Sequence, residues 1–181
     1  MSRLETIDCE RAPEKTTKLL NEIKEQMGML PNVVLTIANS PAALEAFWAA
    51  RTALEGGVLP EKLRRLLAVT VAEANHAHYC TCGRTAMAKA SGCTEEEIVD
   101  ARRGVSTDRR LDAALQFAKE LVEKRGWVTD GEFRHLRDVG YDNREITEVI
   151  ANVGLFIFGD YLTQVAETEV DFPEVVELVG V

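Results

Sequence analysis

The chain has 181 residues, which is enough for one well-buried core and short for two. A hydrophobic content of 46% and a charged content of 28% are ordinary for a soluble globular protein. The formal net charge of −9 argues against non-specific binding to nucleic acid or to an anionic membrane, because both depend on basic protein surface.

The sequence also indicates in which cellular compartment the protein is expected. No stretch approaches the ~18–20 uninterrupted apolar residues that a membrane helix needs, and the first residues lack the apolar core of a signal peptide. In a reducing compartment, four cysteines are expected as thiols rather than as a disulfide framework. We therefore expect a cytoplasmic protein that binds neither nucleic acid nor membrane.

All of the expected elements are helices. Most begin at a capping residue or proline and then show apolar residues at helical spacing. No strand-like alternation is present. In chain order, the helices are expected near residues 13–27, 33–38, 42–54, 60–74, 86–90, 94–102, 108–121, 129–139 and 143–166. The fold class is therefore all-α, with a lead-in at residues 1–12 and a single multi-helix domain at residues 13–181.

Residues 73–84 gather two of the four cysteines and two of the three histidines. If this stretch is one continuous helix, Glu73, His76, Cys80 and Arg84 share a face, because they are separated by three, four and four positions. Histidine and arginine one turn away would stabilise a Cys80 thiolate. A new helix beginning near His78 would add its N-terminal dipole. An accessible Cys80 of low pKa, more reactive to alkylation than the other cysteines, is therefore expected.

The remaining cysteines are not expected to act as the catalytic nucleophile. Cys82 points about 200° away from Cys80 on a helix, so we expect a small buried hydrophobic residue. Cys9 and Cys93 are expected to have no role. Alternation of His76, His78, Cys80 and Cys82 would suit a metal on an extended strand, but the flanking helical patterns oppose one. No metal and no cofactor are therefore expected.

Several short segments, in order and spacing, carry a family resemblance. They are Val71-Ala-Glu73-Ala-Asn75, Tyr79-Cys80, Thr85-Ala-Met-Ala-Lys89, Gly92-Cys-Thr-Glu-Glu-Glu-Ile98 and Val165-Ala-Glu-Thr-Glu-Val-Asp171-Phe-Pro173. With them the chain resembles the carboxymuconolactone decarboxylase family, in its alkylhydroperoxidase D-like (AhpD-like), peroxidase-related branch. The resemblance covers most of the chain, from Leu30 to the end. It implies an all-α fold and a homo-oligomer, expected as a trimer, hexamer or dimer.

The family's reactive motif is Cys-x-x-Cys-x-x-x-His with an upstream glutamate. The resemblance places the peroxide-attacking second cysteine at Cys80 and the resolving first cysteine at Ala77. It places the motif histidine at Arg84 and the glutamate at Arg65. A second glutamate, common in this branch four residues before the first cysteine, falls on Glu73.

These departures change the implied chemistry. Without a cysteine at position 77, the fast local disulfide cannot form. Arg84 stabilises a thiolate but cannot relay a proton, because its pKa lies above ~12. His78 and then His76 remain as proton carriers. The implied candidate catalytic residues are Cys80, His78, Glu73, His76 and Arg84.

The resulting hypothesis is a one-cysteine, thiol-dependent peroxidase with antioxidant function. Cys80 would become a sulfenic acid, and an outside thiol, or Cys82 after local unwinding, would reduce it. The expected partners are a small hydroperoxide and a thiol reductant. Two alternatives stay open: a decarboxylase acting on a small carboxylated lactone, and a non-enzymatic helical module for binding or assembly.

Overall fold

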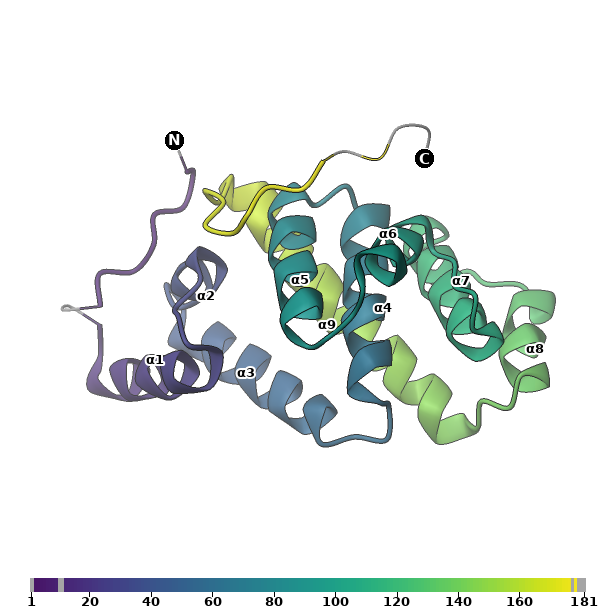
Figure 1. The fold of residues 1–181 in the computed structure, drawn as a ribbon. Coiled ribbons are helices and arrows are strands. Elements are labelled where there is room, and N and C mark those ends of the chain that lie inside the picture. Colours follow the sequence, from purple (N-terminus) through teal and green to yellow (C-terminus); the bar gives the residue numbers. More distant parts are fainter. Residues whose placement is uncertain (1, 10–11, 177, 179–181) are drawn as a thin grey trace.

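The computed structural model describes residues 2–9, 12–176 and 178, and within these residues every regular element is an α-helix (Figure 1). The all-α expectation is confirmed. The helices are α1 (Glu14–Met27), α2 (Asn32–Ile37), α3 (Pro41–Glu55), α4 (Glu61–Ala74), α5 (His78–Ala90), α6 (Glu95–Arg103), α7 (Arg109–Glu123), α8 (Asp130–Asp138) and α9 (Asn143–Ala166).

Local capping explains why most boundaries lie close to the expected ones. The Ser40 hydroxyl accepts a hydrogen bond from the Ala43 N–H and starts α3. Reciprocal capping boxes, in which side chain and backbone bond each other at the first turn, start three further helices. These pairs are Thr94 with Glu97 for α6, Thr129 with Glu132 for α8, and Asp142 with Glu145 for α9.

The continuous helix considered for residues 73–84 is wrong. The helix α4 ends at Ala74, and His76 has a φ of 52°, in the left-handed region that a regular helix excludes. The chain then turns and α5 begins at His78, as the alternative interpretation expected. Glu73 and Cys80 therefore belong to different helices and share no helical face.

The helices form two clusters joined at α4, α5 and α9. The helix α4 contacts α5, α6, α7 and α9, and the larger apolar core lies among these elements. A smaller core joins α1, α2 and α3 through Leu20, Ile23, Ile37, Leu44 and Trp48. In Figure 1, α1–α3 lie on one side of α4 and α5, and α6–α8 lie on the other. The joint between the two cores is where a cavity forms.

By length and composition alone, α9 is the one helix in the described part of the chain that could cross a membrane. One face of this helix lies in the core of the protein. It buries Asn152, Asp160 and Thr163, and it contacts α2, α3, α4, α5 and α7. On this face the polar side chains are buried against other helices of the protein.

Both ends of the chain lie along the helical body. Residues 2–9 have no regular structure, yet the Arg3 N–H donates to the Ala166 carbonyl at 2.7 Å and the Ile7 N–H donates to the Leu35 carbonyl at 3.1 Å. The rest of the expected lead-in, residues 1, 10 and 11, lies outside the described residues. After α9, residues 167–176 run back across α5 as an extended segment, which we call the tail (Figure 1).

Candidate functional site

A cavity of about 150 Å³ opens between the two cores. Its walls come from α1, α2, α3, α4, α5, α9 and the tail, so no single stretch of sequence builds it. Most of the lining is apolar, including Val33, Phe47, Met87, Leu155, Phe156 and Phe172. Cys80 and Arg84, one turn apart on α5, are two of the polar groups in the wall. The structure thus brings these two expected site residues together.

The Cys80 thiol is buried, with 6% of the residue exposed. Its Sγ lies 3.5 Å from the Thr163 hydroxyl oxygen on α9. Burial raises the pKa of Cys80 to about 11; Arg84 lowers it and Asp160 raises it. The expected low pKa is therefore wrong, because loss of water outweighs the guanidinium charge.

Arg84 is held by the core rather than left free to stabilise a thiolate. Its guanidinium pairs with the fully buried Asp160 carboxylate at 2.6 Å and donates to the carbonyls of Ala68 and Phe156 at 2.9 and 2.8 Å. The Asn75 amide donates to the same carboxylate at 2.8 Å. Arg84 and Asp160 thus act on the pKa of Cys80 in opposite directions.

The tail closes one side of the cavity. The ring of Phe172 lines it, packs edge-on against Tyr79 with centroids 5.9 Å apart, and lies against Gly83. The Tyr79 hydroxyl donates to the Asp171 carboxylate at 2.7 Å. The other carboxylate oxygen accepts from the Asn32 N–H at 2.7 Å. Burial and the neighbouring carboxylate raise the pKa of Tyr79, so its hydroxyl stays protonated.

Glu73 and His76 do not line the cavity. The Glu73 carboxylate receives two hydrogen bonds from Arg102, at 2.8 and 3.3 Å. Arg102 also donates to the Val176 carbonyl at 2.9 Å and so ties the tail to α6. His76 is exposed in the turn between α4 and α5. Both residues have structural positions in this arrangement, away from Cys80.

His78 and Cys82 form a separate cluster with Glu174 of the tail. His78 Nε2 lies 2.8 Å from the Glu174 carboxylate, and Cys82 Sγ lies 3.8 Å from His78 Nε2 and 3.6 Å from the carboxylate. This donor set is the one group among the described residues that could hold a metal ion. The direct His78–Glu174 contact already holds the tail without one. Cys82 is fully buried, as the sequence predicted.

Sequence reasoning missed much of the cavity wall. Arg51 on α3 and Arg64 on α4 line it, and Arg65 lies beside Arg64. Nothing in the spacing of these arginines distinguishes them from solvated helix positions. Only the resemblance gave a signal, since it placed Arg65 where the family has a glutamate.

The fold and the cavity define an all-α, AhpD-like protein with one thiol in an apolar pocket. Its structure is similar to an uncharacterised peroxidase-related protein from Silicibacter sp. TM1040, with a TM-score of 0.81 and 25% identity over 93% of this chain and 91% of that one. A peroxidase-related protein with an AhpD core from Ralstonia eutropha JMP134 gives 0.82 and 22%, over 94% and 92%. The debrominase Bmp8, in complex with 2,3,4-tribromopyrrole, gives 0.82 and 18%, over 94% and 92%.

Residues 39–124 match the model of the carboxymuconolactone decarboxylase family. A comparison with curated proteins gives no match. The matched segment runs from the start of α3 through α7 and contains Cys80, Arg84 and the cavity arginines. This segment of the chain therefore matches the carboxymuconolactone decarboxylase family, and the fold is similar to that of AhpD-like, peroxidase-related proteins.

Proposed function

We propose that this protein is a one-cysteine, thiol-dependent peroxidase in which Cys80 reacts with a small organic hydroperoxide. The observation that carries the proposal is the position of Cys80 Sγ in the wall of a mostly apolar cavity. Peroxidase-related relatives of the same fold support the assignment. An apolar cavity suits an organic hydroperoxide better than hydrogen peroxide, because it rewards burial of a carbon skeleton.

The first step oxidises the sulfur by two electrons. The Cys80 thiolate attacks the terminal oxygen of the hydroperoxide; an S–O bond forms as the O–O bond breaks. Cys80 becomes a sulfenic acid, and the alkoxide that leaves takes a proton. No histidine lines the cavity in the described part of the chain, and Arg84 does not release a proton at neutral pH. Water entering the cavity is therefore the proton source.

Regeneration needs a thiol from outside the protein. Cys80 is the one cysteine among the described residues that lines the cavity, while Cys82 faces His78 and Glu174. A first external thiol condenses with the sulfenic acid, releasing water and leaving a mixed disulfide. A second external thiol attacks that disulfide, restores the Cys80 thiol and departs as the oxidised donor.

Trapping the sulfenic acid tests the proposal. The Cys9→Ser protein, which lacks the exposed cysteine, would be treated with cumene hydroperoxide and dimedone and then mapped by mass spectrometry. We expect a dimedone adduct on Cys80, none after Cys80→Ser, and an unchanged adduct after Cys93→Ser. An adduct confined to Cys82 or Cys93, or no adduct at any cysteine, would contradict the proposal.

The arginines of the cavity wall favour a second candidate, a decarboxylase acting on a small carboxylated lactone. Guanidinium groups bind carboxylates well. Decarboxylation also needs no thiolate, so it is compatible with a Cys80 thiol that stays protonated. Substrate-dependent release of carbon dioxide that survives blocking of the cysteines would favour this candidate. Loss of that release after Cys80→Ser would count against it.

A further inference from the structure

The cavity wall is cationic, although the chain as a whole carries a formal net charge of −9. Four arginines and one glutamate line it: Arg51, Arg64, Arg65, Arg84 and Glu55. Three of the arginines have a carboxylate partner. Arg84 pairs with Asp160 at 2.6 Å, Arg51 with Glu55 at 3.0 Å and Arg65 with Glu61 at 3.0 Å.

Arg64 is the exception. Among the described residues it forms no ion pair, and its one side-chain hydrogen bond goes to the Leu59 carbonyl. It is only partly exposed, in contact with the cavity. A guanidinium has five N–H donors, so most of its donors remain to be satisfied by water or by a ligand. Arg64 is therefore the group in the cavity wall best suited to receive an anion.

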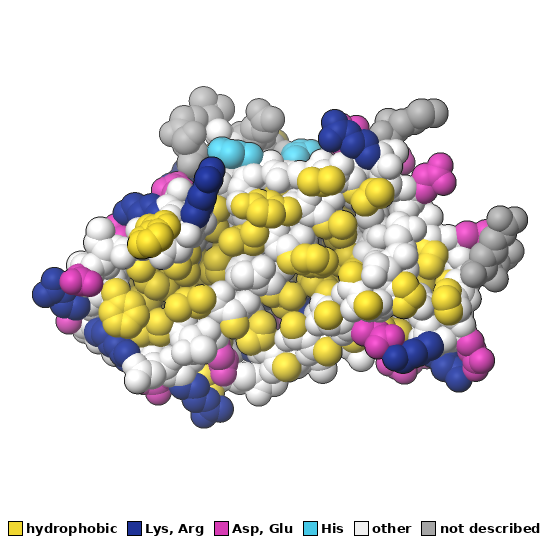
Figure 2. All heavy atoms as spheres, turned by 180° about the vertical axis from the view of Figure 1, so that it is seen from behind, with side chains coloured by type: hydrophobic (Ala, Val, Ile, Leu, Met, Phe, Trp, Pro, Cys, Tyr) yellow, Lys and Arg dark blue, Asp and Glu magenta, His cyan; other side chains and the backbone are white. Residues whose placement is uncertain are grey.

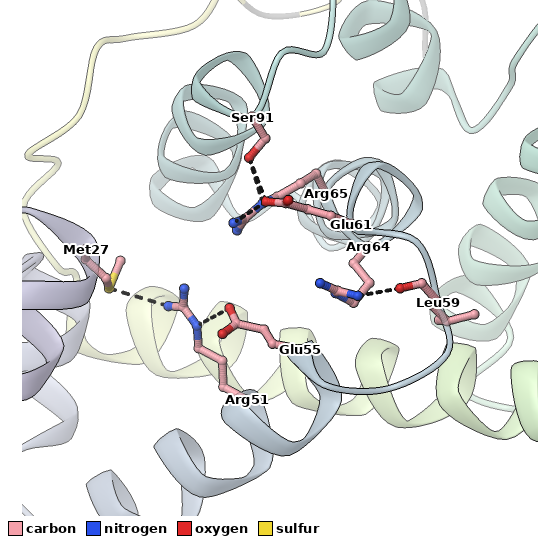
Figure 3. Close-up of polar contacts among 8 residues, drawn as sticks. All are labelled: Met27, Arg51, Glu55, Leu59, Glu61, Arg64, Arg65 and Ser91. Carbon is pink, nitrogen blue, oxygen red and sulfur yellow. Dashed lines mark hydrogen bonds and ion pairs between the residues drawn. The ribbon is translucent and has the colours of Figure 1, made fainter.

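Figure 3 shows how the neighbouring arginines lie around this position. The guanidinium groups of Arg51, from α3, and of Arg64 and Arg65, from α4, turn toward the same space. Arg51 is fixed by Glu55 and by a contact of 3.4 Å with the Met27 sulfur. Arg65 is fixed by Glu61 and by a hydrogen bond of 3.0 Å to the Ser91 hydroxyl. In this view both held cations lie on the same side of Arg64, with the Glu55 carboxylate drawn between Arg51 and Arg64.

The rest of the cavity wall indicates that the other part of the ligand is apolar. Phe47, Leu155, Phe156 and Phe172 offer aromatic and aliphatic surface with few polar groups. The volume of about 150 Å³ is similar to that of an engineered apolar cavity that binds benzene. A six-membered ring or a short hydrocarbon chain therefore fits the apolar part.

We propose that the cavity binds an organic anion, a carboxylate on a compact apolar body, and that Arg64 receives the carboxylate. If the proposed peroxidase function holds, this anion is the substrate, and the hydroperoxide itself carries the carboxylate. Only that identification of the substrate rests on the proposed function. The binding of the anion is a property of the cavity alone. Charge-assisted hydrogen bonds from a partly buried guanidinium supply the selectivity for an anion over a neutral molecule.

Calorimetric titration of the Cys80→Ser protein tests binding without the redox chemistry. The probes are 3-phenylpropionate and 3-phenylpropionamide, which match in size and differ in charge. We expect the carboxylate to bind at least about tenfold more tightly than the amide, a difference of about 1.4 kcal/mol. Raising the salt concentration should narrow that difference, because salt screens the partly exposed guanidinium. Equal affinities for the two probes would overturn the proposal.

Arg64→Gln, made in the Cys80→Ser protein, tests whether Arg64 is the residue that binds the carboxylate. We expect it to lower the affinity for the carboxylate about tenfold or more and to leave that for the amide nearly unchanged, while Arg64→Lys keeps part of the preference. The matched control is Arg134→Gln: Arg134 is an exposed helical arginine that also donates to a backbone carbonyl, that of Asp130 at 3.2 Å, outside the cavity wall. Equal effects of Arg64→Gln and Arg134→Gln would assign the preference to general charge and overturn the role of Arg64.

The two proposals fail separately. Anion-selective binding without a Cys80 sulfenic acid in the native protein would sustain the anion site and reject the peroxidase. Formation of a Cys80 sulfenic acid without a preference for the carboxylate probe would support the peroxidase and reject the anion site.

Discussion

Cys80 illustrates how burial changes the chemistry that a sequence motif suggests. The sequence places it one turn before Arg84, which favours a thiolate. In the structure the thiol is buried and Arg84 is matched by Asp160, so the pKa of Cys80 rises to about 11. At pH 7 roughly one Cys80 in ten thousand is then a thiolate. The thiol is positioned for reaction but poorly ionised in the empty cavity.

The raised pKa predicts a steep pH dependence. The thiolate is the reactive form and its fraction grows with pH, so the rate of Cys80 alkylation should rise about tenfold per pH unit between pH 7 and 9.5. Iodoacetamide labelling of the Cys9→Ser protein, followed by peptide mass spectrometry, measures it. A rate that levels off below pH 8 would show that the pKa is lowered instead. Circular dichroism at each pH is the control for unfolding.

Ala77 is the residue whose replacement should change the chemistry most. It is fully buried, precedes the first turn of α5, and lies three residues before Cys80. In Ala77→Cys we expect hydroperoxide to produce a local 77–80 disulfide, and turnover with a dithiol donor to rise several-fold, because the sulfenic acid gains an adjacent thiol. Unchanged turnover, with the disulfide formed, would show that regeneration does not limit the rate.

At the scale of elements, the tail is what completes the cavity. It is held by Asp171 on Tyr79, by Glu174 on His78 and by the Val176 carbonyl on Arg102. Two residues that the sequence suggested for catalysis, His78 and Glu73, thus hold the tail directly or through Arg102. The tail follows α9 but packs on α5, more than eighty residues earlier in the chain.

Gly83 offers a test of this closure. A Cβ at Gly83 would lie 3.0 Å from the Phe172 ring, so Gly83→Ala should displace the ring and loosen the tail. We expect faster hydrogen exchange over residues 169–176. The control is Gly154→Ala in α9, where a Cβ would meet nothing within 4 Å; it should gain up to about 1 kcal/mol in helix stability. Unchanged exchange in Gly83→Ala would mean that Phe172 does not seal the cavity.

The sequence predicted elements better than it predicted the site. Capping boxes such as Asp142 with Glu145 are local, so the start of α9 could be inferred without tertiary knowledge. The turn at His76 could not, because a non-glycine residue with φ of 52° gives no compositional signal. The partners of Glu73 and His78 lie 29 and 96 residues away. Nothing local in the sequence indicates such pairings.

At the scale of the whole molecule, α9 exposes an apolar stripe. Ile150, Phe158, Tyr161 and Val165 are 42–62% exposed and recur at helical spacing. The helix runs behind α4 and α5 in Figure 1, and Figure 2, seen from the opposite side, shows hydrophobic side chains gathered across the middle of the face. We propose that this stripe is the contact between copies of the chain in the homo-oligomer that the family resemblance implies.

Sedimentation velocity tests this contact. We expect the protein to sediment as an oligomer and Phe158→Glu to shift it toward the monomer, because a charge in an apolar interface is costly to bury. Val105→Glu, a change at another exposed apolar residue away from α9, is the control and should leave the oligomer intact. A native protein that sediments as a monomer at all concentrations would contradict the proposal.

The most direct test of the central claim is the consumption of cumene hydroperoxide in the presence of a dithiol donor, compared between the native protein and Cys80→Ser. We expect turnover in the native protein, rising with pH, and a loss of about 95% or more of that turnover in Cys80→Ser, because the attacking sulfur is removed. Cys93→Ser should retain full turnover. Equal turnover in the native protein and in Cys80→Ser would contradict the account.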